Sequence, residues 1–441
     1  MERLTNEITF NDRDEYKRSD IANKVITLIT SDIDTSPMII DGGWGTGKTE
    51  FCYKLINLIK EKEIAYQVVY IDAFNEDHTD APILTLLAAI VALLPKQERS
   101  SLISKALPAL RFGLKTTLKA GANWVLKQNT EELAEDFQEA IKDSSNAAID
   151  GAIEALLEDH IESEKNINAL KTALVEISKE KPIIIFIDEL DRCKPSFAIS
   201  ILENIKHIFD VDNVHFILVT NTKQLEASIH HIYGQSVDAK RYLDKFVRFT
   251  LSLPEYFKLN KNNNELSSSH HWATTVSKSE ALKIIDTPTS EFIILLIKAR
   301  KLSLREVETL ARHIEIYQKI SSNPITNDIA SPYAALYILG IFIYCFEKEI
   351  AIKMSLGGFD KDNLFKALNI SRINYGPNGY PGHLQTLLYA MIKESGANDA
   401  PTIEIARDWD IHVENLFEYS YIPDGNIYKM VTNAIDTLQM K

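Results

Sequence analysis

Two kinds of hydrophobic pattern alternate along the first part of the chain. In residues 19–30, and again after residue 48, apolar positions recur every three or four residues, which is typical of amphipathic helices. Between such stretches lie short apolar runs that are rich in β-branched residues. These runs occupy 38–41, 67–72, 183–187, 214–219 and 247–253. They predict an α/β fold with a parallel five-stranded sheet flanked by helices.

The rest of the chain is mainly helical in pattern. Residues 75–179 lack strand patterns and predict a helical insertion between the second and third strands, so the core is expected in 1–74 and 180–257. The amphipathic second half of the insertion either packs on this core or pairs with helices of another chain, and the absence of long strict heptads favours packing. Residues 258–289 begin with an asparagine- and serine-rich run and predict a linker or loop. Residues 290–441 predict a helical C-terminal domain.

Composition narrows the possible functions. The 441 residues are 45% hydrophobic and 25% charged, which is typical of a folded globular protein of two or three domains. The formal net charge of −14 disfavours non-specific nucleic-acid binding as the main activity. Three cysteines without a CxxC pair argue against a disulfide framework or zinc knuckle and fit a reducing cytoplasm. The longest apolar runs are shorter than the roughly 20 residues of a membrane span, so no membrane insertion is expected.

The strongest chemical signal is a glycine-rich loop between the first expected strand and the following helix. Residues 42–49 read GGWGTGKT and fit the pattern G-x-x-x-x-G-K-[ST] of a P-loop. Its glycines let backbone N–H groups surround a phosphate, and the helix adds its positive N-terminal end. The predicted nucleotide-binding residues are Gly42, Gly43, Trp44, Gly45, Thr46, Gly47, Lys48, Thr49 and Glu50.

Specific roles follow for the residues at the end of this loop and at the end of the third strand. We expect Lys48 to neutralise the β- and γ-phosphates and the Thr49 hydroxyl to ligate Mg²⁺. Asp188 and Glu189 end an apolar run, which is typical of a Walker B segment at the tip of a buried central strand. Asp188 is predicted to hold Mg²⁺, and Glu189 to orient and polarise the attacking water.

Two further catalytic candidates rest on weaker patterns. Asn221 follows the fourth strand and is predicted to sense the γ-phosphate or the attacking water, although an ordinary strand-end turn is an equal interpretation. Arg241 is one of several basic residues that flank these elements and is a candidate arginine finger. A solvated charge or a salt bridge is the commoner role for such an arginine.

These motifs together resemble the KAP family of P-loop NTPases, ASCE-type relatives of the STAND and AAA+ branches. The resemblance rests on the loop 42–49, the segment 187–195 (IDELDRCKP), and the stretch 241–246 (RYLDKF) followed by Leu253-Pro254. It implies hydrolysis of ATP or GTP with Mg²⁺. It also implies an insertion between the two motifs, which often carries paired transmembrane helices in the family, whereas the insertion of this chain has no such spans.

The chain departs from the family pattern at two positions. Many members have Asp where Glu189 stands, which keeps a carboxylate in place, and an acidic residue is common where this chain has Thr220-Asn221. Bacterial members occur in phage-defence and plasmid-exclusion systems. The resemblance therefore implies a role in antiviral defence for this chain.

Three hypotheses of function follow. The first is a cytoplasmic Mg-dependent ATPase whose hydrolysis drives a conformational change or assembly and acts on an effector or regulatory protein. The alternative is a scaffold that binds nucleotide, turns over slowly and forms a homo-oligomer. The third hypothesis is a nucleic-acid motor. Such a motor needs a basic channel, and the negative net charge of the chain argues against one. The expected partners are a nucleotide, a second copy of the chain and an effector protein, without a membrane.

Overall fold

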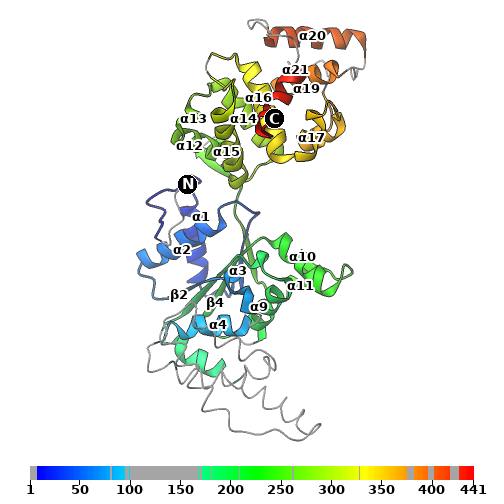
Figure 1. Cartoon of the computed structure of the whole chain (residues 1–441). Coiled ribbons are helices and arrows are strands. Elements are labelled where there is room, and N and C mark those ends of the chain that lie inside the picture. The colour runs from blue at the N-terminus through cyan, green and yellow to red at the C-terminus, as the bar shows by residue number, and fades with distance from the viewer. Residues whose placement is uncertain are drawn as a thin grey trace. The chain divides into compact units, whose positions relative to one another are not determined.

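The chain forms two compact units, Met1–Leu253 and Pro254–Lys441 (Figure 1). The computed structural model describes residues 7–79, 82–94, 99, 168, 171–179, 181–207, 209–260, 263–326, 328–374, 382–395, 402–417 and 427–441. Most of the helical insertion predicted for 75–179 lies outside the described residues. Inside them it contributes helix α4 (Pro82–Val91) and a helical segment at 171–179.

A five-stranded parallel sheet forms the centre of the first unit, in the order β2-β3-β4-β1-β5. The strands are β1 (Met38–Asp41), β2 (Gln67–Asp72), β3 (Ile183–Asp188), β4 (Val214–Thr220) and β5 (Phe249–Ser252). The predicted fold class and all five strand positions are confirmed. In register, Asp41 lies opposite Thr220, and Asp72 lies opposite Asp188. The polar residues that end the strands therefore gather along one edge of the sheet.

Helices cover both faces of this sheet. Strand β3 is buried along its whole length, and its side chains alternate between two hydrophobic clusters, with Ile185 in one and Phe186 in the other. This burial on both faces explains its uninterrupted apolar run. Helices α1 (Ser19–Ile29) and α2 (Lys48–Glu61) belong to the cluster of Phe186, and α4, α9 (Pro195–His207) and α10 (Thr222–Tyr233) to the other. Short elements join them: α3 (Ala73–Glu76), η1 (Asp77–Thr79), η2 (Leu190–Arg192) and α11 (Ala239–Leu243).

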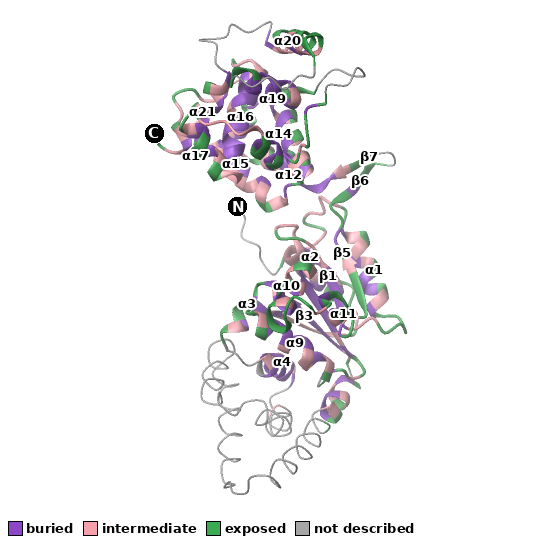
Figure 2. Cartoon of the chain, turned by 90° about the vertical axis from the view of Figure 1, so that its right-hand side faces the viewer, coloured by how far each residue is buried: buried purple, intermediate pink, exposed green. Residues whose placement is uncertain are grey.

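The second unit consists of an antiparallel hairpin and helices around a core of their own. The hairpin joins β6 (Tyr256–Asn260) to β7 (Asn263–Leu266). The helices are α12 (Ser267–Lys278), α13 (Glu280–Lys283), α14 (Thr287–Arg300), α15 (Leu304–Ile320), α16 (Ser331–Phe346), α17 (Lys348–Ser355), α18 (Lys361–Ala367), α19 (His383–Glu394), α20 (Ile403–Phe417) and α21 (Ile427–Leu438). Figure 2 shows buried residues concentrated in α14, α16 and α19.

The range 258–289, which predicts a linker or loop, differs in the structure. It contains the second part of β6, strand β7, helices α12 and α13, and the start of α14. Trp272 on α12 is fully buried, and its indole N–H donates to the Ser290 hydroxyl across 2.9 Å. Polar residues dominate the sequence here, but a single large aromatic side chain and Leu282 anchor the segment to the core. Burial of these few residues outweighs the local preference for a loop.

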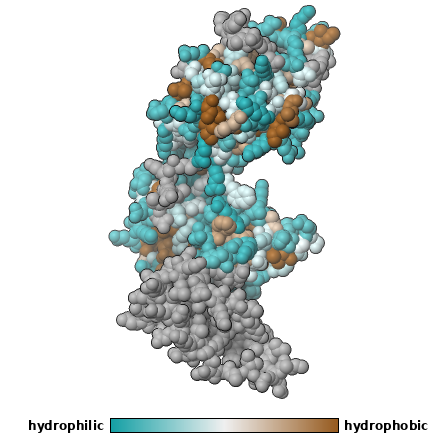
Figure 3. Space-filling view, viewed as in Figure 1, coloured by the Kyte–Doolittle hydropathy of each residue, from teal (hydrophilic) through white to brown (hydrophobic). Residues whose placement is uncertain are grey.

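The face in Figure 3 is mostly hydrophilic, with separate small hydrophobic patches on both units. Within the part of the chain that the structure describes, no helix combines the length and apolar character that crossing a membrane requires.

Candidate functional site

The glycine-rich loop connects β1 to α2 with a backbone that its glycines make possible. Gly45 and Gly47 have φ angles of 73° and 83°, in the left-handed region that other residues avoid. A Cβ on Gly42 would lie 2.7 Å from the Thr46 hydroxyl oxygen. Glycine therefore stands where the backbone adopts left-handed angles, at Gly45 and Gly47, and where Thr46 leaves no room for a side chain, at Gly42.

Lys48 lies against this loop. Its ammonium nitrogen donates to the carbonyl oxygens of Gly42 at 2.7 Å and Gly43 at 3.1 Å. Partial burial lowers the pKa of Lys48, and the neighbouring carboxylates of Asp191 and Asp188 oppose this change. The ammonium group of Lys48 therefore lies at the point where the P-loop pattern predicts a phosphate.

Asp188 ends β3 and is 1% exposed. It accepts hydrogen bonds from the Tyr70 hydroxyl at 3.2 Å and from the Glu189 backbone N–H at 2.7 Å, and the Thr49 hydroxyl lies close enough to lower its pKa. Burial raises its pKa, and these donors oppose the rise. The structure thus brings together Thr49 and Asp188, the two residues that the sequence predicts as Mg²⁺ ligands.

Tyr70 is a site residue that sequence reasoning missed. It lies on β2, and its ring packs against that of Tyr53 on α2, with the ring centroids 4.9 Å apart. Burial, followed by the charge of Asp188, raises the pKa of Tyr70, so it stays a protonated donor. A tyrosine two residues before the end of a strand carries no distinctive signal, because only the pairing of β2 with β3 brings it to Asp188.

Glu189 leaves the strand in a left-handed conformation, with a φ of 59°. Such a conformation is uncommon for a residue with a side chain and is found at functional sites. Its carboxylate pairs with the Arg192 guanidinium at 3.0 Å. Burial raises the pKa of Glu189, Arg192 opposes the change, and the carboxylate of Asp188 adds to it. A raised pKa makes Glu189 a stronger proton acceptor than an ordinary glutamate.

Asp191, which the sequence analysis assigned no role, connects two parts of the site. It is 6% exposed and accepts hydrogen bonds from the Trp44 indole N–H at 2.6 Å and from the Thr220 hydroxyl at 3.2 Å. Trp44, predicted as a nucleotide-binding residue, therefore has its polar atom directed to Asp191. The acidic spacing D-E-L-D after β3 was the only signal of this residue.

Asn221 lies at the same edge of the sheet. It follows Thr220, the last residue of β4, and is the N-cap residue of α10. The loop begins beside it, because the Gly42 N–H donates to the Thr220 carbonyl at 3.2 Å. Asp41 accepts from both the backbone and the hydroxyl of Thr222, which fixes the start of α10 against the end of β1. Asn221 therefore follows directly after the residue whose carbonyl accepts from the start of the P-loop, and its sensor role stays a prediction.

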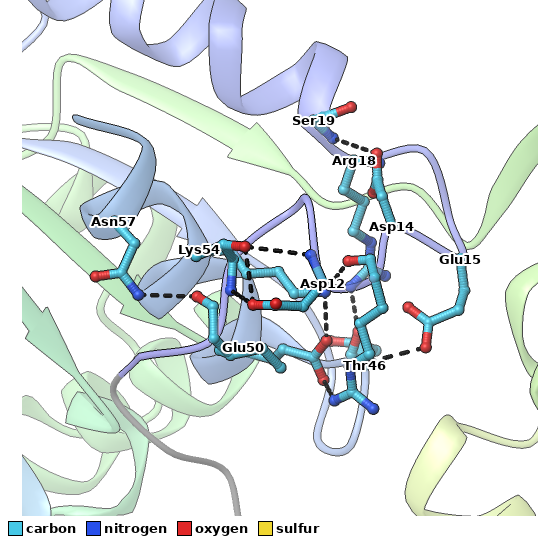
Figure 4. A network of polar contacts seen from close by, with 12 residues as sticks. Asp12, Asp14, Glu15, Arg18, Ser19, Thr46, Glu50, Lys54 and Asn57 are labelled. Atoms are coloured by element: carbon cyan, nitrogen blue, oxygen red, sulfur yellow. Dashed lines mark hydrogen bonds and ion pairs between the residues drawn. The ribbon is translucent and has the colours of Figure 1, made fainter. Parts of the chain in front are cut away.

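Two predicted site residues have other surroundings. Arg241 is exposed on α11, and the contacts among the described residues do not join its side chain to the P-loop network. Glu50, on the first turn of α2, pairs with Arg13 and Lys54, both at 2.7 Å (Figure 4). Glu50 therefore holds the N-terminal segment against α2 in this structure.

Arg18, a second residue that sequence reasoning missed, reaches the P-loop from the N-terminal segment. Its guanidinium donates to the Thr46 carbonyl at 3.0 Å, and it is 7% exposed. A charged residue before an expected helix gives no hint of this contact, since the two partners lie 28 positions apart.

The residues present fit a magnesium nucleotide. The Thr49 hydroxyl and the Asp188 carboxylate are hard oxygen donors of the kind that Mg²⁺ prefers. Among the described residues, no group of three or more His, Cys, Asp or Glu is arranged to hold a metal ion by itself. An ion at Thr49 and Asp188 would therefore complete its coordination with phosphate oxygens and water, as Mg²⁺ commonly does.

The parallel sheet, the glycine loop with Lys48, and the carboxylates at the end of β3 define a P-loop NTPase. Comparison with known families matches residues 18–321 to the KAP family P-loop domain. The chain belongs to the KAP family. The match extends past Pro254 to the end of α15, so it is longer than the stretch that carries the resemblance in the sequence motifs.

Similarity to solved and characterised proteins is remote. The ORC2 protein of Aeropyrum pernix, solved in ADPNP-ADP complexes, has 14% sequence identity and a TM-score of 0.29, over 96% of this chain and 85% of that one. None of the curated proteins matches the chain.

Proposed function

We propose that the protein is a Mg²⁺-dependent ATPase whose hydrolysis is coupled to a conformational change or to assembly. Membership of the KAP family supports nucleotide hydrolysis in general. The observation that carries the proposal is the P-loop itself: the Lys48 ammonium donates to the Gly42 and Gly43 carbonyls inside the loop, at the edge of the sheet where β3 ends in the buried Asp188.

In this proposal the chain binds the triphosphate with its loop amides and with Lys48. Lys48 would exchange the carbonyl oxygens of Gly42 and Gly43 for phosphate oxygens, because a phosphate is the stronger partner of an ammonium group. Thr49 and Asp188 would hold Mg²⁺, which when bound neutralises charge on the phosphates. Tyr70 keeps the Asp188 carboxylate oriented for this purpose.

Hydrolysis requires a group that orients the attacking water, and we assign this role to Glu189. Its carboxylate is partly accessible and its pKa is raised, which suits a proton acceptor. Asn221, beside the loop, would contact the γ-phosphate or the same water. The remaining catalytic candidate, Arg241, would act on a nucleotide held by a second copy of the chain, since it is exposed on α11.

Removal of Lys48 tests the proposal directly. We expect Lys48→Ala to lower the rate of phosphate release from ATP by about 100-fold or more. The negative charge that develops on the phosphates in the transition state would lose the ammonium group that neutralises it. The matched control is Lys60→Ala on the exposed end of the same helix, which should hydrolyse ATP like the wild type. Unchanged hydrolysis by Lys48→Ala would contradict the proposal, and competition by GTP would measure the preference for the base.

The dependence of the rate on protein concentration tests the roles of Arg241 and of assembly. If Arg241 acts between copies, the rate per chain rises with concentration, and Arg241→Ala removes this rise while nucleotide affinity is kept. A mass change with a non-hydrolysable analogue but negligible turnover would instead favour the slow scaffold. The effector partner, the antiviral role and the cytoplasmic location stay predictions from the sequence.

A further inference from the structure

The contacts of Asp191 extend the proposed site by one residue. We propose that Asp191 is a positioning residue that ties the P-loop to the strand end carrying Asn221, through hydrogen bonds from Trp44 and Thr220. The inference rests on the proposed function, because the elements that it joins are those assigned to phosphate binding and to sensing of the γ-phosphate.

The geometry uses both carboxylate oxygens of Asp191. Oδ2 accepts from the Trp44 indole nitrogen at 2.6 Å, and Oδ1 accepts from the Thr220 hydroxyl at 3.2 Å. Thr220 is fully buried at the end of β4. A buried carboxylate is stable only when its oxygens are hydrogen-bonded, and hydrogen bonds to a charged acceptor are about twice as strong as neutral ones. Asp191 therefore makes a strong bridge between the loop and the sheet.

Trp44 needs such a bridge. The side chain is 53% exposed, so packing covers only part of the ring. Its neighbours in the chain, Gly43 and Gly45, give the backbone wide conformational freedom. The hydrogen bond to Asp191 therefore directs the indole and adds a second tie between the loop and the end of β4, beside the bond from the Gly42 N–H to the Thr220 carbonyl.

Glu189 and Asp191 have different roles because their carboxylates have different partners. Glu189 pairs with Arg192 at the surface of the site, whereas both oxygens of Asp191 already accept hydrogen bonds from the protein. Asp191 is therefore suited to hold other groups in place, and Glu189 to act on water.

A double-mutant cycle on the intact chain tests the inference. Asp191→Asn removes the charge of the acceptor, and Trp44→Phe keeps a ring but removes the donor. We expect each change to lower kcat for ATP about tenfold and to alter KM by less than about threefold, because the phosphate-binding amides remain. The double variant should be no more than about twofold slower than either single one, since the first change weakens and the second removes the same hydrogen bond. Asp32→Asn, at an exposed position on the loop after α1, is the control and should match the wild type.

The indole N–H of Trp44 provides a readout that does not depend on activity. In a nitrogen-15 correlation spectrum its resonance is identified by its loss in Trp44→Phe, and in Asp191→Asn it should move upfield as the charged acceptor is lost. If Asp191→Asn does not fold, the same kcat loss in Trp44→Phe and in Thr220→Val, which removes the second donor, supports the bridge. Wild-type kcat in both would overturn it.

Two outcomes separate this inference from the proposed function. An indole resonance that stays in place in Asp191→Asn, or losses in kcat that simply multiply in the double variant, would overturn the bridge even in an active ATPase. A shifted resonance in a protein that hydrolyses no nucleotide would overturn the proposed function and leave the Asp191–Trp44 tether standing.

Discussion

Arg18 donates a hydrogen bond from its guanidinium to the backbone carbonyl of Thr46, across 3.0 Å, and so connects the start of α1 to the P-loop (Figure 4). Burial lowers the pKa of Arg18, and the neighbouring groups Tyr16 and Glu50 oppose the change. The guanidinium nevertheless stays charged, as arginine does in proteins. The N-terminal segment is therefore part of the structure that holds the loop.

Replacement of Arg18 should weaken both the fold and the loop. We expect Arg18→Met, which keeps an apolar stem, to lower the free energy of unfolding by about 1–3 kcal/mol, because the Thr46 carbonyl loses a charged donor. Nucleotide affinity should fall with it. Urea denaturation and nucleotide titration measure the two effects. Lys24→Met, on the exposed face of α1, serves as the control, and equal losses in both variants would argue against a specific role of Arg18.

The role of Glu189 predicts a pH dependence with a definite sign. Glu189 must be ionised to accept a proton, and burial raises its pKa above the usual 4.5. Hydrolysis should therefore decline, as the pH falls, at a higher pH than an ordinary glutamate would cause. Glu189→Gln should lower kcat by about 100-fold or more and remove this acid limb, while nucleotide still binds.

A substitution of Arg192 tests independently the direction in which the pKa of Glu189 shifts. Its charge favours the ionised form of Glu189, so Arg192→Met should raise the pKa of Glu189 and move the acid limb to higher pH. The profile of kcat against pH measures this shift. A limb that moves to lower pH, or one that persists in Glu189→Gln, would show that another group titrates.

Asp188 should destabilise the protein when no nucleotide is bound. Burial raises its folded-state pKa above the ordinary 3.8, so the folded protein binds the proton more tightly than the unfolded chain. The resulting loss of stability is absent below pH 3.8 and grows as the pH rises through the folded-state pKa. At pH 7, Asp188→Asn should therefore raise the free energy of unfolding, on the order of 1 kcal/mol, and weaken binding of the magnesium nucleotide.

The wild type and Asp188→Asn are the two proteins to compare. Urea denaturation of both proteins without nucleotide or Mg²⁺, between pH 4 and pH 8, should give a difference that shrinks towards acid pH. A variant that is less stable than the wild type at every pH would mean that the hydrogen bonds to Asp188 outweigh its desolvation.

Gly340 in α16 marks a close approach between two helices of the second unit. A Cβ at this position would lie 2.4 Å from the Val431 carbonyl oxygen and 2.9 Å from the Ala434 Cβ, both on α21. Gly340→Ala should lower the free energy of unfolding by about 1–3 kcal/mol through this clash, despite the better helix propensity of alanine. Gly382→Ala, where an added Cβ meets nothing within 4 Å, is the matched control. Thermal denaturation that ranks the two variants in the opposite order would contradict the contact.

Local patterns were sufficient for much of the fold. The apolar runs locate all five strands of the sheet, and burial on both faces explains the continuous run 183–187 of the central strand β3. The loop motif locates the turn between β1 and α2 because only glycine tolerates its backbone. Patterns were insufficient at 258–289, where helix α12 depends on the burial of one tryptophan among polar residues.

The amino-acid sequence by itself determined that the chain carries a phosphate loop, with Lys48 and Thr49 at its end and a carboxylate pair after a buried strand. Such features are encoded by neighbours in the chain. Only the tertiary structure decided which distant side chains support them: Arg18 on Thr46, Tyr70 on Asp188, and Asp191 between Trp44 and Thr220. These contacts join residues far apart in sequence. Strand order and register, which no local periodicity specifies, bring Tyr70 to Asp188 and Thr220 to Asp191, and the packing of the N-terminal segment on α2 brings Arg18 to the loop.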